Sequence, residues 1–275
     1  MVKTASSAII FCTAIVCGAS SAAALQNLLP KFDFSSFTGS ASKPRSQVGD
    51  RAIEEELLAA VRSQDGRLSN SDDISSLVRR LEESKSSILS PAIAPEVLGT
   101  WRLLHTTNAD TASPIQRKAV DASKYNIYQN IGFADGMEEE RLIVSQVVKF
   151  GPNFQLRVDA LGSTSAFPLP ELTERTSTGE VLGLNILGVS LVGDEAQPDP
   201  DRPDSRIAFV FDEGQFEFGE KFRLPYPVPF RNPLFRDAVK GWIDVTYLSP
   251  TMRISRGNKG TTFVLVKEDP EGKTE

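Results

Sequence analysis

The sequence has few of the side chains on which most catalytic and metal sites depend. Among 275 residues there are only 2 cysteines and 1 histidine. Both cysteines, Cys12 and Cys17, lie in an apolar run near the N-terminus that we interpret below as a removable leader. Disulfide frameworks, thiolate nucleophiles and Cys-ligated zinc sites all need cysteines in the mature chain. We therefore expect none of these, no other metal site and no cofactor.

The single histidine, His105, is a weak candidate for catalysis. Hydrolysis by a serine or a metal needs a histidine together with a carboxylate and a nucleophile or bound water. The sequence contains no G-x-S-x-G elbow, P-loop or dinucleotide fingerprint. We expect His105 on the strand face that carries Trp101, as a structural residue, and we expect that the protein is not an enzyme.

The balance of charge argues against a general nucleic-acid binder. The chain carries 30 Lys and Arg against 36 Asp and Glu, a net charge of -6, whereas contacts with phosphate need a basic surplus. No stretch reaches the roughly 18 consecutive apolar residues of a membrane span. With 24% charged residues the composition is that of a globular protein of one or two domains.

The N-terminus has the pattern of a two-part targeting leader. Residues 1–24 combine one lysine, a short apolar run and three alanines before Leu25, which is the layout of a signal peptide. Residues 25–50 are rich in Ser and poor in acidic residues, like a transit peptide, and we expect them to be disordered. The combination resembles the leader of proteins that enter plastids of secondary endosymbiotic origin. Ordinary secretion followed by a disordered linker is the alternative.

Residues 51–90 predict two amphipathic helices. Each has one apolar stripe at helical spacing, and we expect both stripes to pack on the body of the domain rather than enter a membrane. The stripes consist of Ile53, Leu57, Leu58 and Val61, and of Ile74, Leu77, Val78 and Leu81.

From residue 97 to residue 268 the apolar period changes from that of a helix to that of a strand. Residues 154–160 alternate cleanly between apolar and polar side chains, which indicates a strand buried on one face. Similar runs occur at 101–106, 127–133, 142–148, 181–192, 206–211, 242–248, 252–255 and 262–267. Because few helix-length patterns separate them, we expect an antiparallel sheet. The pattern alone leaves open a barrel or a sandwich.

Three segments interrupt or follow the strands. Residues 194–204 (DEAQPDPDRPD) are acidic and proline-rich, so we expect an exposed loop. Residues 222–235 (FRLPYPVPFRNPLF) have too many prolines for a central strand and predict an extended flap over one edge or mouth of the sheet. Residues 269–275 are expected to be a disordered tail.

Several motifs resemble the plastid lipid-associated protein family, also called fibrillins. They occur in the family's order across residues 51–267. In sequence they are GTWRLLHTT (99–107), SPIQR (113–117), LPYPVPFR (224–231), KGWIDVTYL (240–248), RISRGNKG (253–260) and FVLVKE (263–268). The family-motif residues that we single out are Gly99, Asp244, Tyr247, Arg253, Arg256, Gly257 and Asn258. The chain differs from the commonest sequence of the family at His105 and in its long acidic loop.

This resemblance implies a mainly β fold, a lipocalin-like antiparallel β-barrel preceded by two N-terminal α-helices, in a single domain over residues 51–268. It also implies a plastid protein, in plastoglobules, thylakoids or stroma, that binds lipophilic molecules. The expected ligand is a carotenoid, a prenylquinone or a glycerolipid. Candidate contacts in the barrel interior are large apolar residues on strand faces: Trp101, Leu103, Phe154, Leu156, Phe209, Phe211 and Trp242.

We expect two contacts that involve arginine side chains of the strands. The opening Gly99-Thr100-Trp101 resembles that of lipocalin-type barrels, in which a late arginine packs over the indole, so we expect Arg253 or Arg256 above Trp101. A carboxylate that faces the interior needs a partner, and we pair Asp244 with Arg253.

The C-terminal part of the chain is locally basic. Residues 219–260 hold eight basic residues against three acidic ones, a net +5, interleaved with aromatic residues. Such a surface would suit an anionic lipid interface, although an ordinary solvated face is an equal alternative. The candidate surface residues are Arg223, Tyr226, Phe230, Arg231, Phe235 and Arg236.

Three functional hypotheses therefore remain. The first is a non-catalytic carrier of a hydrophobic molecule or lipid that is also peripheral to a plastid lipid surface. The second is a structural coat of lipid particles whose barrel is filled by its own side chains. The third is an enzyme on a lipophilic substrate, which would be favoured if His105 and Asp244 lay within hydrogen-bonding reach beside a cavity.

Overall fold

In the computed structural model of this chain, the described residues all belong to the unit of residues 44–275. The described residues are 47–63, 72–84, 87–107, 124–134, 141–169, 172, 202, 204–227, 230–233, 239–257 and 261–268. The leader up to residue 46, the expected strand at 181–192, most of the acidic loop and the C-terminal tail lie outside them.

Two helices come first, as the apolar stripes predict. They are α1 (Gln47–Ser63) and α2 (Asp72–Glu82), followed by a short 3-10 helix, η2 (Pro95–Val97). Helix α1 begins at Gln47, so it includes the last four residues of the segment 25–50. Acidic residues in the first turn of α2 and basic residues in its last turn complement the helix dipole.

Nine antiparallel strands follow within the described part of the chain. They are β1 (Gly99–Thr106), β2 (Asn126–Phe133), β3 (Leu142–Gly151), β4 (Phe154–Ser163), β5 (Arg206–Phe218), β6 (Phe222–Pro225), β7 (Lys240–Leu248), β8 (Met252–Gly257) and β9 (Thr262–Lys267). The expected mainly β fold with two preceding helices is confirmed.

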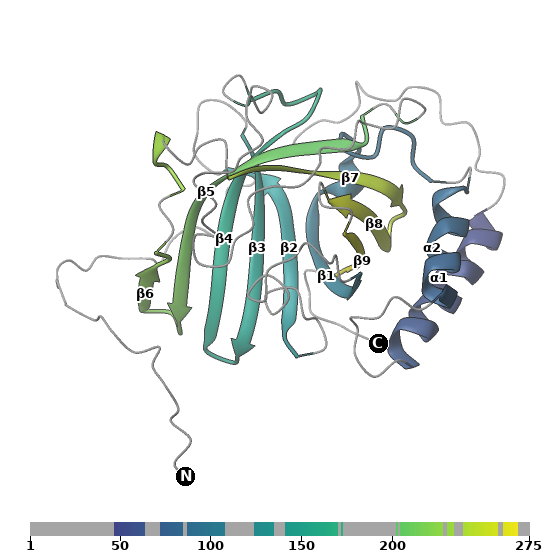
Figure 1. Ribbon diagram of the computed structural model, residues 1–275, viewed down its shortest axis with the longest axis horizontal. Helices are drawn as coiled ribbons and strands as arrows, with labels where there is room; N and C mark the ends of the chain where they lie inside the picture. The colour runs from purple at the N-terminus through teal and green to yellow at the C-terminus, as the bar shows by residue number, and fades with distance from the viewer. Residues whose placement is uncertain are drawn as a thin grey trace, which may run out of the picture. The chain divides into compact units, whose positions relative to one another are not determined.

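The strand pairing closes on itself (Figure 1). The order is β4-β3-β2-β1-β9-β8-β7-β5, and β5 pairs in turn with β4. The closure depends on the length of β5, whose 13 residues pair with β7 at their beginning and with β4 along the rest. The last part of β5 also carries β6 as a hairpin. This ring of pairings is compatible with the lipocalin-like barrel that the resemblance implies.

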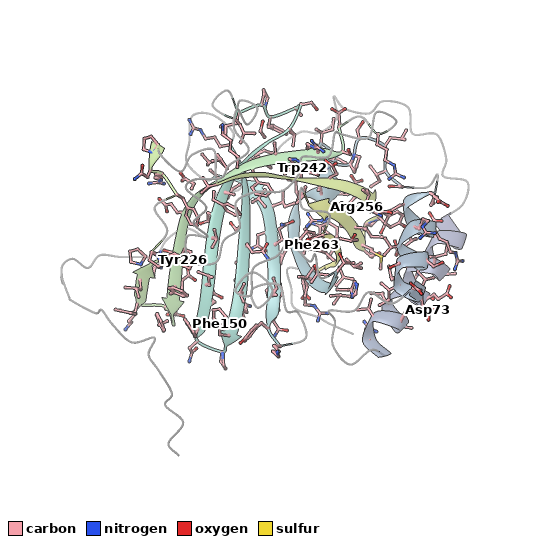
Figure 2. All side chains as sticks on the ribbon, viewed as in Figure 1. Asp73, Phe150, Tyr226, Trp242, Arg256 and Phe263 are labelled. Carbon is pink, nitrogen blue, oxygen red and sulfur yellow. The ribbon has the colours of Figure 1, made fainter. Side chains whose placement is uncertain are left out.

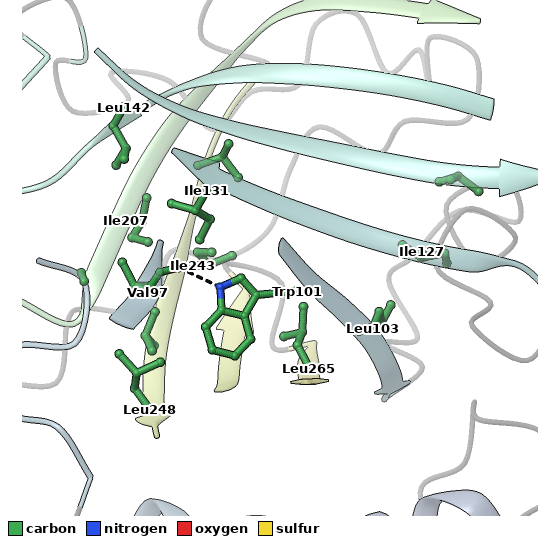
Figure 3. Close-up of a cluster of buried hydrophobic side chains, with 14 residues drawn as sticks. Val97, Trp101, Leu103, Ile127, Ile131, Leu142, Ile207, Ile243, Leu248 and Leu265 are labelled. Carbon is green, nitrogen blue, oxygen red and sulfur yellow. Dashed lines mark hydrogen bonds between the residues drawn. The ribbon is translucent and has the colours of Figure 1, made fainter. Parts of the chain in front are cut away.

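One face of the ring forms an apolar interior (Figure 3). Opposed residues in an antiparallel ladder share a face, and the pairs Leu103–Leu265 and Ile207–Ile243 belong to one buried cluster. The other buried members are Ala92, Val97, Trp101, Ile127, Ile131, Leu142, Val144, Val148, Val245 and Leu248.

The helices cover the outer face of β1, β7, β8 and β9. Leu57 and Leu81, both fully buried, pack with Tyr247 and Ile254 in a second cluster. Each fully buried side chain of this kind contributes about 1.5–3 kcal/mol to folding. Glu54 of α1 also accepts a hydrogen bond from the Tyr247 hydroxyl at 2.8 Å. The expectation that both apolar stripes pack on the body of the domain is therefore confirmed.

Candidate functional site

Trp101 anchors one part of the interior. Its ring is fully buried, and its Nε1 donates a hydrogen bond to the Val97 carbonyl at 2.7 Å, which ties β1 to η2 (Figure 3). The Arg253 guanidinium lies 5.0 Å from the ring centroid, so the expected stack of Arg253 on Trp101 is confirmed. Arg256 is not involved, because it forms an ion pair with Glu82 of α2 at 2.6 Å (Figure 2).

The proposed pairing of Asp244 with Arg253 is wrong. Both carboxylate oxygens of Asp244 accept hydrogen bonds from Arg206 of the neighbouring strand β5, at 2.6 and 2.8 Å. The register explains the error, because Arg253 faces the interior opposite Leu265, whereas Asp244 lies opposite Arg256 on the outer face. The two groups therefore lie on different sides of the ring.

Trp242 shares the outer face with Asp244, which corrects its assignment to the interior. Its neighbours in the strand, Ile243 and Val245, belong to the interior cluster, and side chains alternate along a strand. The Arg206 guanidinium lies 3.6 Å from the Trp242 ring centroid. Trp242 is thus the platform of an outer arginine stack.

His105 does not lie on the face that carries Trp101. A β-bulge after Leu103 places His105 opposite Val264, a member of the helix-covered cluster. Strands β9 and β8 also separate β1 from β7, which carries Asp244. Three strand spacings amount to roughly 14 Å. The hydrogen-bonded His105 and Asp244 pair that would favour an enzyme is not formed.

The other interior candidates divide among three regions. Leu103 is a member of the interior cluster, and Leu156 and Phe209 pack against it. Phe211 packs instead in a third cluster with Val210 and Phe230. Phe154 lies at the start of β4, where it stacks on Phe218 of β5 at 4.6 Å between ring centroids.

The family-motif residues have structural surroundings. Gly99 has a φ of 118°, a conformation that favours glycine, and the side chain of Lys267 lies 3.1 Å from the position of a Cβ there. Tyr247 joins the helix-covered cluster, and burial is the main cause that raises its pKa. Gly257 pairs with Ile243. Asn258 lies outside the described residues.

Two adjacent hairpins expose a group of aromatic rings that we call the aromatic lip. The lip consists of Phe150 and Phe154 from the β3–β4 hairpin and Phe218 and Phe222 from the β5–β6 hairpin. The rings contact one another in a chain with centroid distances of 4.8, 4.6 and 5.5 Å. Gly219 donates a backbone hydrogen bond to Asn153, which joins the two turns. Phe222 keeps 55% of its surface exposed and Phe218 40%.

From the lip, further rings continue toward the interior cluster, and we call them the aromatic path. In order they are Phe216, Tyr226, Phe230, Phe211 and Phe209, with centroid distances between 5.3 and 6.1 Å from Phe154 onward. Gly214 makes room for this path, because a Cβ there would lie 2.8 Å from Tyr226. Gly241 does the same for the ring of Phe209, at 2.9 Å.

Among its described residues, the basic side chains of the stretch 219–260 have different surroundings. Arg253 is buried, Arg256 pairs with α2, and Arg231 forms ion pairs with Asp212 and Glu213. Among the predicted surface residues, Arg223 is exposed, Tyr226 is half-buried and Phe230 is buried. Phe235 and Arg236 lie outside the described residues. Sequence reasoning missed the lip, although the motif FEFGEKF at 216–222 placed three phenylalanines around a turn.

Two classes of site find no support in the described part of the chain. Its histidines, cysteines and acidic residues form no group of three that could hold a metal ion. None of its helices is long and apolar enough to span a membrane.

Comparison with known proteins agrees with the sequence motifs. The PAP_fibrillin family model matches residues 51–167 and 204–266. A probable plastid-lipid-associated protein 12, chloroplastic, from Arabidopsis thaliana is 35% identical over 72% of this chain and 39% of its own length. Plastid lipid-associated protein 1, chloroplastic, from Brassica campestris is 25% identical over 71% of this chain and 59% of its own length. No solved structure matches. The chain belongs to the PAP/fibrillin family of plastid lipid-associated proteins.

Proposed function

We propose that this chain is a non-catalytic plastid protein that docks on a lipid surface through the aromatic lip and binds a lipophilic molecule in the ring interior. The family relationship supports association with plastid lipids. The observation that carries the proposal is the unbroken series of rings from the exposed Phe222 to Phe209, which packs against the interior cluster. A lipophilic molecule that follows these rings stays in contact with apolar surface from the lipid phase to the interior.

The composition of the lip suits a lipid interface. Its exposed aromatic rings are accompanied by Leu224, which is 42% exposed, and by the exposed cations Lys149, Lys221 and Arg223. Burial of apolar surface gives about 25 cal/mol per Å², and each cation near an anionic surface adds about 1 kcal/mol. The lip therefore provides both contributions to peripheral binding without a membrane span.

Part of the strand face that Trp101 shares is accessible to solvent. Gln129 and Gln146 face one another across β2 and β3, on the face that Trp101 shares by register, and both remain half-buried. Leu156, which packs against the interior cluster, is also half-buried. Solvent therefore reaches part of the inner face, which favours a carrier over a ring that its own side chains fill.

A flotation assay tests the docking. The double variant Phe218→Ser and Phe222→Ser removes two exposed rings, and we expect its partition onto vesicles of galactolipid with a minor share of phosphatidylglycerol to fall at least about tenfold. The matched control is Phe133→Ser, because Phe133 is 36% exposed at the other end of the strands, opposite Leu142 of β3. Equal flotation of the double variant and the wild type would contradict docking through the lip.

Solvent extraction followed by mass spectrometry tests whether the protein carries a lipophilic molecule in the ring interior. The mature protein, purified from its own plastids, should yield a lipophilic molecule in stoichiometric amount, compared with an unrelated plastid protein that yields none. A protein that is empty yet floats with lipid particles would support the coat in place of the carrier. The densely packed cluster around the fully buried Trp101 is the observation that favours this second candidate.

A further inference from the structure

The ring interior contains a buried cation, and most of its N–H donors have no hydrogen-bond acceptor. Arg253 has no exposed surface, and its Nη2 donates to the Gln129 side chain. Its Nε and Nη1, which carry one and two N–H groups, have no hydrogen-bond partner. Within the described ranges no carboxylate pairs with Arg253, and burial lowers the pKa of its guanidinium from its ordinary value to about 9.

A second unsatisfied group lies on the same strand face. Ser255 is two residues further along β8, opposite Val245 of the interior cluster, and its buried Oγ has no partner. The outward neighbours on β8 are Met252 and Ile254, which pack under the helices. Arg253 and Ser255 therefore both present unused donors to the ring interior.

The charge of this region is positive. The Lys267 ammonium lies 5.2 Å from the centroid of the Trp101 ring and donates to the Glu96 carbonyl at 2.8 Å. Its pKa is lowered mainly by burial and also by the charge of Arg253, although the charge of Glu96 raises it. An unpaired buried charge is expensive, and each unmet buried donor adds to the cost. A ligand that supplied the missing acceptors would offset this cost.

We propose that Arg253, with Ser255, binds the oxyanion head of a lipid ligand in the ring interior. The ligand class is an anionic amphiphile, with a carboxylate or phosphate head at Arg253 and a hydrocarbon tail along the apolar interior. A neutral carotenoid or quinone would leave the charge of Arg253 uncompensated, whereas an oxyanion both neutralises it and accepts its free N–H groups. The half-buried Gln129, which Arg253 contacts, shows that solvent reaches the neighbourhood of the guanidinium.

This inference rests on the proposed carriage of a ligand in the interior, and one fluorescence assay separates the two. The probes are cis-parinaric acid, a fluorescent fatty acid, and its methyl ester, which keeps the tail and loses the charge. We expect the wild type to bind the acid roughly ten- to hundredfold more tightly than the ester. Inorganic phosphate and a lysophosphatidate, used as competitors, distinguish a free anion from a lipid head.

Two arginine variants make the assay specific. Arg253→Met should remove the preference for the acid, so that its affinities for the acid and for the ester become equal. The matched control is Arg206→Met, because Arg206 also stacks on a tryptophan but lies on the outer face with Asp244, and it should keep the preference. Ser255→Ala is a smaller change and should reduce the preference for the acid in part. It replaces Arg253→Met in the assay if that variant does not fold.

Each outcome has a distinct meaning. Equal affinity of the wild type for acid and ester would overturn the oxyanion site and leave the carrier in place. Failure to bind either probe would overturn both the site and the interior carriage. Competition by inorganic phosphate alone, without the lysophosphatidate, would overturn the lipid ligand in favour of a free anion.

Discussion

The ring contains two arginine–tryptophan stacks that differ in one respect. On the outer face, Arg206 stacks on Trp242 and binds both oxygens of Asp244. On the inner face, Arg253 stacks on Trp101, is fully buried and has no carboxylate among the described residues. The outer stack is complete within the protein, whereas the inner stack retains unused donors. The same pair of residue types can therefore be complete within the protein at one place and keep unmet donors at another, which is the basis of the proposed oxyanion site.

The largest difference between the stacks should appear when the two indoles are removed. Trp101→Ala deletes a ring with no exposed surface, and we expect it to lower the free energy of unfolding by about 3–5 kcal/mol. Trp242→Ala should cost at most about half as much, because Trp242 lies outside the three buried clusters. Urea unfolding followed by circular dichroism measures both. Equal losses would remove the distinction between an inner anchor and an outer platform.

A smaller effect is expected from Asp244→Asn, which breaks the outer pair. Hydrogen bonds to charged groups contribute about 1.5–3 kcal/mol, and partial exposure of both side chains places this pair at the lower end, near 1.5 kcal/mol. The control is Glu82→Gln, which breaks the pair with the more exposed Arg256 and should cost about 0.5 kcal/mol or less. Chemical denaturation at neutral pH, with and without added salt, is the measurement. A loss at Asp244 no larger than that at Glu82 would contradict a complete outer stack.

The smallest effect is a pH dependence specific to the inner stack. Burial lowers the pKa of Arg253 to about 9, below the ordinary value of a guanidinium, so between this pH and that ordinary value the unfolded state binds more protons than the folded state. Stability from this group therefore rises as the pH rises, with a slope of at most about 1.4 kcal/mol per pH unit. Between pH 8 and pH 10 the free energy of unfolding of the ligand-free wild type should increase by about 1 kcal/mol relative to that of Arg253→Met. Parallel curves for the two proteins would show that Arg253 is not an uncompensated cation.

Much of the fold could be predicted from the sequence because its determinants are local. The apolar stripes of α1 and α2, with Leu57 and Leu81 at their centres, lie against the sheet as the helical period predicts. The strands at 206–211, 242–248 and 262–267 appear within β5, β7 and β9, although β5 continues to Phe218. The strand at 181–192, in contrast, stays a prediction.

The candidate site could be predicted only in part. The resemblance of the G-x-W opening predicted an arginine above Trp101 but left Arg253 and Arg256 as alternatives, and the structure selects Arg253. The choice of face for β7 could not be made, because large apolar residues occur on both of its faces, with Trp242 on one and Ile243 on the other. The aromatic lip was missed because it depends on two hairpins that β4 and β5 bring together.

The sequence by itself determined the helices, the alternation of the strands, the family and the scarcity of catalytic residues. These properties depend on neighbours within a few residues, or on motifs that can be recognised directly in the sequence. Only the tertiary structure decided which side chains meet. A single-residue bulge reverses the face of every residue beyond it, as it does for His105 and again between Val245 and Tyr247. The partner of a charge likewise depends on which strands become neighbours, so Asp244 binds Arg206, whereas Nε and Nη1 of Arg253 have no partner among the described residues.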